Sequence, residues 1–89
     1  MPVTQLPNFL LRSTTGFEHK LIRYSDYGAI ALLDSCDPQC RYVLVTGLHP
    51  LPNGRYVWNH INAFSVRSVA VREFSAQCYL FMKEDENEQ

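Results

Sequence analysis

Apolar residues in this chain fall into short runs that are rich in β-branched and aromatic side chains and are separated by turn residues. Such runs are typical of β-strands. They predict four strands, over residues 17–24, 29–33, 41–47 and 55–61, which we expect to form an antiparallel meander. The run at 29–33 is almost continuously apolar, which indicates a central strand covered on both faces.

Alternation within the runs assigns side chains to the two faces of the sheet. In the third run, Val43 and Val45 share one face, and the other face carries Tyr42, Leu44 and Thr46. In the fourth run, one face carries Tyr56, Trp58 and His60, and the other carries Val57, Asn59 and Ile61. The Asn53-Gly54 pair before this run is a strong hairpin signal, since both residues tolerate a left-handed backbone.

The last third of the chain favours a helix, because neither Gly nor Pro occurs after Gly54. Ser65 is a suitable N-cap, and one helical stripe would contain Val66, Val69, Ala70 and Phe74. The short apolar run Cys78–Met82 predicts a final strand. The fold class is therefore α+β, an antiparallel meander of four to five strands with one helix in the C-terminal half packed on a face. The alternative is an all-β small barrel in which residues 65–74 form a strand.

The first sixteen residues differ in character from the rest, because Pro2 and Pro7 disfavour regular structure there. Asn8 is placed to cap one helical turn through residues 9–11, whose apolar side chains either cover the core or pack on a neighbour. We therefore divide the chain into an N-terminal arm (1–16), a single β-rich globular domain (17–83) and an acidic tail (84–89).

Composition and charge restrict the class of protein. The chain has 89 residues, 46% of them hydrophobic, and a net charge of −1. That balance provides no overall attraction to nucleic acid or to a membrane surface. No apolar segment approaches the length of a membrane span or the pattern of a signal peptide, so we expect a cytoplasmic protein. A domain this small buries a limited core, which favours a homo-oligomer.

Three cysteines are present, Cys36, Cys40 and Cys78, and an odd number argues against a disulfide-stapled secreted scaffold. Cys36 and Cys40 form a single C-x3-C spacing with no second pair, so we interpret them as loop thiols. A redox-sensitive disulfide and a zinc site are the alternatives.

Catalytic and cofactor motifs are not recognisable in the sequence. A Cys–His–Asp trio can be assembled from Cys36 or Cys40, His60 and Asp34, but nothing visible nearby would activate the thiol. The four glycines are isolated, so no phosphate-binding loop can be read. We expect a protein that is not an enzyme and holds no cofactor.

Protein binding is the remaining class, because aromatic residues and arginine dominate interface hot spots. The candidate protein-binding residues are Arg41, Tyr42, His49, Leu51, Arg55, Tyr56 and Trp58. The predicted function is a small non-catalytic protein-binding or regulatory protein, an inhibitor or adaptor of the kind found as bacterial or phage accessory factors. The alternative is a small β-rich nucleic-acid-binding domain, in which Tyr42, Tyr56 and Trp58 form one face with Arg41 and Arg55.

Overall fold

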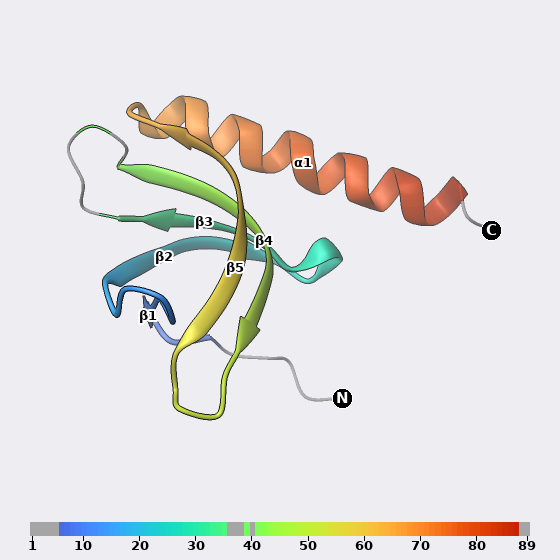
Figure 1. The fold of residues 1–89 in the computed structure, drawn as a ribbon. Coiled ribbons are helices and arrows are strands. Elements are labelled where there is room, and N and C mark those ends of the chain that lie inside the picture. Colours follow the sequence, from blue (N-terminus) through green and yellow to red (C-terminus); the bar gives the residue numbers. More distant parts are fainter. Residues whose placement is uncertain (1–5, 36–38, 40, 88–89) are drawn as a thin grey trace.

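A computed structural model describes residues 6–35, 39 and 41–87 of the chain. The described strands are β1 (Phe9–Leu11), β2 (Glu18–Ser25), β3 (Ile30–Asp34), β4 (Tyr42–Pro50) and β5 (Tyr56–Phe64). A short 3-10 turn, η1 (Tyr27–Ala29), joins β2 to β3, and one helix, α1 (Arg67–Asn87), follows β5. The strands form one antiparallel sheet in the order β1-β2-β3-β4-β5, with α1 packed along it (Figure 1). The predicted α+β meander is confirmed.

The sheet curls into a half-barrel because the pairing of its strands is irregular. The β4–β5 register shifts twice, between Leu44 and Val45 and between Thr46 and His49. Extra residues of this kind bend a strand and increase its twist. As a result the start of β5 returns to the segment after β1, where the Ser13 amide donates a 2.8 Å hydrogen bond to the Tyr56 carbonyl. We call the meeting point of residues 12–16 with Arg55 and Tyr56 the closure end.

Two apolar clusters lie on the two faces of the sheet. The inner cluster, inside the curl, contains Leu10, Ala31, Leu33, Val45, Leu48 and Trp58. The helix cluster, between the sheet and α1, contains Ile30, Leu32, Tyr42, Leu44, Ala70 and Phe74. All five residues of β3 are buried and its apolar side chains alternate between the clusters. Both the double-sided burial of this strand and the predicted facing of residues 42–45 are confirmed.

The segment after Ser65 is helical well beyond the range that the sequence indicated. Ala70, Phe74, Cys78 and Phe81 recur at intervals of four, four and three residues, and all belong to or pack against the helix cluster. That spacing keeps them on one helix face, so the predicted strand at Cys78–Met82 is wrong. The small barrel with a strand at 65–74 is wrong for the same reason.

The N-terminal segment joins the sheet. Residues 9–11 form β1, which pairs with β2, and Leu10 is fully buried opposite His19. The helical turn predicted here is wrong, because pairing with β2 satisfies the backbone and turns Leu10 into the inner cluster. Phe9 and Leu11 point away from that cluster and are exposed.

Candidate binding surface at the closure end

The seven residues expected to bind a partner do not form one surface. Tyr42 is buried in the helix cluster, whereas Trp58 is buried in the inner cluster. The register pairs Tyr42 with Phe64 and Pro50 with Tyr56, so Tyr42 and Tyr56 lie at opposite ends of the β4–β5 hairpin. The aromatic and arginine face expected for nucleic-acid stacking is therefore not assembled by these residues.

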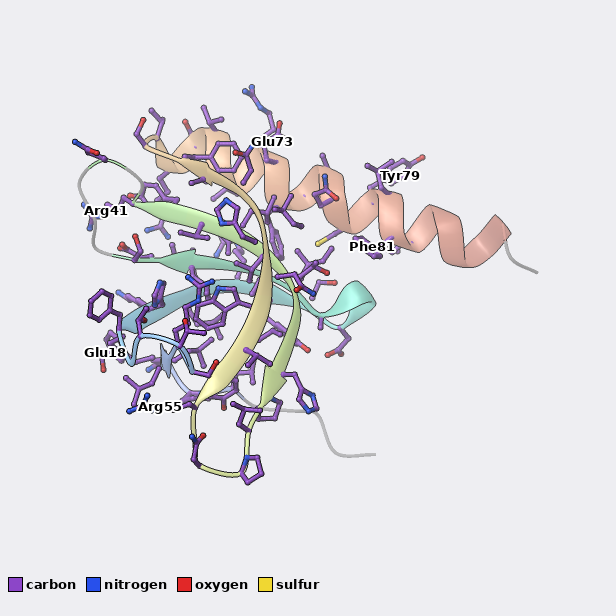
Figure 2. All side chains as sticks on the ribbon, in the orientation of Figure 1. Glu18, Arg41, Arg55, Glu73, Tyr79 and Phe81 are labelled. Atoms are coloured by element: carbon purple, nitrogen blue, oxygen red, sulfur yellow. The ribbon has the colours of Figure 1, made fainter. Side chains whose placement is uncertain are left out.

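Arg41 lies next to Tyr42, and its labelled side chain is far from that of Arg55 (Figure 2). Its Nε is 3.3 Å from the carboxylate of Asp34, a residue of which little is exposed. The Arg41 guanidinium also stands over the Tyr42 ring, 5.7 Å from the ring centroid. These contacts connect the start of β4 to the end of β3, and they give Arg41 a structural role.

The closure end contains two of the predicted residues, Arg55 and Tyr56, and Arg12 at this end stands over the ring of Trp58 in the inner cluster. The Arg55 Nη1 donates to the Ser13 carbonyl at 3.4 Å, and its guanidinium lies against Gly16. Tyr56 is half-buried and packs against the inner cluster. This arrangement holds the loop between β1 and β2 against the first residues of β5.

His49 and Leu51 belong to the turn that leads into the closure end. His49 is exposed near the end of β4, and Leu51 is half-buried. The Leu51 amide donates to the Arg55 carbonyl at 2.8 Å, and the Asn53 side-chain oxygen accepts from the Arg55 amide at 3.0 Å. The hydrogen-bonded turn therefore presents Arg55 in a defined position.

His19 is the titratable group that most resembles a functional residue, because it is buried among aromatic and basic neighbours. Its Nδ1 lies 3.3 Å from the Phe17 carbonyl oxygen. Burial lowers the pKa of His19, and the nearby Arg12 lowers it further, while the Phe17 carbonyl and Asp34 act in the opposite direction. Since the net direction is downward from 6.5, the imidazole is neutral at pH 7. It is therefore suited to packing against Trp58.

Within residues 6–35, 39 and 41–82, no group of three or more His, Cys, Asp or Glu side chains is arranged to hold a metal ion. Cys78 is a free, half-buried thiol against the helix cluster. The predictions for Cys36 and Cys40 lie outside the described residues.

Three exposed apolar residues of the β1–β2 hairpin were not among the predicted site residues. Phe9 is 50% exposed, Leu11 41% and Phe17 70%. α1 packs mainly over η1, β3, β4 and β5, so it leaves the outward side chains of β1 uncovered. Phe9, Leu10 and Leu11 are all apolar, so the sequence carries no alternation that would show which of them faces outward, and three residues are too few to separate a strand from a helical turn.

Comparisons with protein-family models, curated proteins and solved structures give no match for this chain. Among the described residues, no helix combines the length and the apolar character that crossing a membrane requires.

Proposed function

We propose that this chain is a non-catalytic protein-binding protein whose binding surface is the β1–β2 hairpin together with the closure end. The observation that carries this proposal is the exposure of Phe9, Leu11 and Phe17 within one hairpin. Phe9 and Leu11 lie on the same face of β1, and neighbouring exposed apolar side chains of this kind commonly mark interaction sites on small proteins. The role that we propose is regulatory, because a protein without catalytic activity affects its partner by masking a surface of it or by bridging it to another molecule.

The polar surroundings of these residues indicate the kind of partner. Within the hairpin, Phe9 is paired with Lys20 and Leu11 with Glu18, so charges of both signs border the apolar side chains. Arg55 adds a guanidinium at the closure end. The complementary surface is therefore a protein with an apolar centre and a mixed-charge rim, rather than a polyanion.

The surface is also held in place before a partner arrives. Leu10 is fully buried between the two exposed residues of β1, and Ser13 is hydrogen-bonded to both Tyr56 and Arg55. A surface that is already ordered loses less conformational entropy on binding. This supports capture by a rigid hairpin instead of by a free arm.

A matched pair of variants tests the proposal. Phe9→Ser combined with Leu11→Ser removes the apolar centre, and Tyr79→Ser removes a similarly exposed aromatic from α1. Affinity-purified wild-type and variant proteins are incubated with an extract of the source cells, and the captured proteins are quantified. We expect a specific partner retained by wild type and Tyr79→Ser, and reduced by about tenfold or more in the double variant.

Folding and the nature of the captured material are checked in the same experiment. The fluorescence of Trp58, the single tryptophan, reports whether the inner cluster is intact in each variant. Equal capture by the folded double variant would contradict the proposal. Material removed by nuclease and lost steeply with added salt would instead support nucleic-acid binding.

A further inference from the structure

We propose that His19 is a pH-sensitive switch for the closure end. While its imidazole is neutral, the β1–β2 loop (residues 12–16) stays against β5, and a proton on the imidazole releases this loop while the rest of the sheet keeps its fold. The inference does not depend on the proposed function, because it concerns an equilibrium within this chain. It rests on the position of His19, which is buried and contacts both the hairpin that carries the loop and the indole of Trp58.

The β1–β2 loop is attached to β5 by a small group of polar contacts. The Ser13 amide donates to the Tyr56 carbonyl at 2.8 Å, and the Arg55 Nη1 donates to the Ser13 carbonyl at 3.4 Å. The guanidinium of Arg12 stands over the indole of Trp58, 5.4 Å from the ring centroid. Arg12 and Tyr56 form an isolated parallel bridge and not a continued ladder. Segments that are held by few contacts open locally, without unfolding of the whole protein.

His19 is connected to both sides of this closure. Its Nδ1 lies 3.3 Å from the Phe17 carbonyl oxygen, which also accepts a hydrogen bond from the Arg12 amide at 3.0 Å. Its ring lies edge-on to the indole of Trp58, with the centroids 5.1 Å apart. Because a carbonyl can only accept, Nδ1 carries the proton of the neutral ring, and Nε2 is the nitrogen that takes up a further proton. A charge on this ring therefore lies inside the closed curl, where water has little access.

The surroundings of His19 disfavour this charge on balance. Burial has the largest effect, and Arg12, directly after β1, adds a like charge over the same indole. Asp34, at the end of β3, acts in the opposite direction, but its carboxylate is already paired with Arg41 at 3.3 Å. The net result is a lowered pKa of His19 in the closed state. The other titratable groups on the inner face of the sheet are Tyr24 of β2 and Tyr56 and His60 of β5.

Opening of the β1–β2 loop removes both causes of this unfavourable environment. It carries Arg12 away from the indole and lets water reach the imidazole of His19. In the open state the pKa of His19 returns to its ordinary value of 6.5, whereas the closed state takes up the proton only at lower pH. As the pH falls below 6.5, the ratio of open to closed molecules therefore rises, until the closed state is protonated as well. The rise is at most about tenfold per pH unit.

Amide hydrogen exchange of the full chain, followed by NMR, tests the proposal. Each exchange rate is divided into the intrinsic rate at the same pH, so that the protection factor of the Ser13 amide measures the ratio of closed to open molecules. Between about pH 7.5 and about pH 5.5, this factor should fall by up to about tenfold in the wild type. His19→Gln keeps a donor for the Phe17 carbonyl but cannot titrate, so its factor should stay nearly constant. No fall in the wild type, or an equal fall in His19→Gln, would overturn the proposal.

Low concentrations of urea distinguish local opening from unfolding of the whole protein. The amides of β3, a central strand, exchange through global unfolding, so their protection should fall as urea is added. The Ser13 amide should be at least about tenfold less protected than these amides and nearly insensitive to urea. Circular dichroism at about pH 5.5 should show that α1 is retained. A Ser13 amide with the protection and urea dependence of β3 would overturn the proposal, because the loop would then open only with the whole fold.

A pair of charge variants that keep His19 in place tests the switch independently. Arg12→Gln removes the like charge, so the closed state should take up its proton at a higher pH and the fall in Ser13 protection should become smaller. Burial remains, so the fall should not disappear. Lys20→Gln removes the same charge from the next residue of β2, whose side chain is exposed on the opposite face, and it should keep the wild-type fall. Equal pH dependence in Arg12→Gln and Lys20→Gln would overturn the part assigned to Arg12.

Discussion

The imidazole of His19 lies edge-on against the indole of Trp58, with the ring centroids 5.1 Å apart and the ring planes at 73°. His19 is on β2 and Trp58 is on β5, with β3 and β4 between them in the sheet. The two rings therefore meet across the inside of the curl. The guanidinium of Arg12 stands over the same indole, 5.4 Å from its centroid. This stack of side chains joins the two edges of the sheet at the closure end.

Trp58 is therefore expected to stabilise the fold, and its removal should do more than weaken partner capture. Trp58→Ala should lower the free energy of unfolding by about 3–5 kcal/mol, because it removes a large buried side chain and leaves a cavity. Tyr79→Ala, at an exposed aromatic, should change it by less than about 0.5 kcal/mol in the monomer. Urea unfolding followed by circular dichroism measures both. A Trp58→Ala protein as stable as wild type would show that the indole is not part of the core.

The lowered pKa of His19 makes stability depend on pH in a defined direction. The unfolded chain takes up a proton on His19 near pH 6.5, whereas the folded protein does so only at lower pH. Above that range both states are neutral and the residue contributes no pH dependence. As the pH falls below 6.5, the unfolded state is favoured by protonation, so stability declines until the folded-state pKa is passed.

Unfolding experiments at about pH 7.5 and about pH 5.5 isolate this effect. The loss of stability between the two pH values should be smaller in His19→Gln than in wild type. His60→Gln removes an exposed histidine and should retain the wild-type loss. The same loss in wild type and His19→Gln would mean that His19 does not cause the pH dependence.

Gly28 and Phe81 form a close contact that ties α1 to η1. A β-carbon at position 28 would lie 2.8 Å from two carbons of the Phe81 ring, and the residue has a φ of 70°. Gly28→Ala should therefore destabilise the protein by about 2–3 kcal/mol, combining left-handed strain with displacement of the ring. Gly54 also has a positive φ of 86°, but open space surrounds it, so Gly54→Ala should cost only about 1 kcal/mol.

A double-mutant cycle separates the two causes at Gly28. In a Phe81→Ala background the ring is absent, and Gly28→Ala should cost about as much as Gly54→Ala. Chemical denaturation of the four proteins gives the coupling free energy. Full additivity of Gly28→Ala and Phe81→Ala would contradict the contact.

Adjacent leucines in β1 provide a test of whether the N-terminal segment belongs to the core. Leu10 is fully buried, and Leu11 is among the exposed apolar residues. Leu10→Ala should lower the free energy of unfolding by about 2–5 kcal/mol. Leu11→Ala should change it by less than about 0.5 kcal/mol. Similar small losses for the two variants, measured by thermal unfolding, would mean that β1 behaves as an arm.

Local sequence pattern determined most of the secondary structure. Strands were expected around β2, β3, β4 and β5, and the uninterrupted apolar run at 29–33 corresponds to a strand buried on both faces. These predictions succeed because the period-two alternation reflects a direct physical requirement, the sorting of side chains between two faces. The predictions for two short segments are wrong. Residues 9–11 and 78–82 are too short for their own pattern to distinguish a strand from a helix, and their neighbours decided the outcome.

Only the tertiary structure decided which of these side chains meet. The sequence placed Tyr42 and Trp58 on one candidate surface, but the register shifts of β4 against β5 put them in different clusters. The same irregularities curl the sheet, bring Arg55 to Ser13 and enclose Trp58 between His19 and Arg12. Alternation records which face a side chain takes, but it carries no information on where a strand bends. Bending arises from the pairing of two strands, so it appears only once the whole sheet has formed.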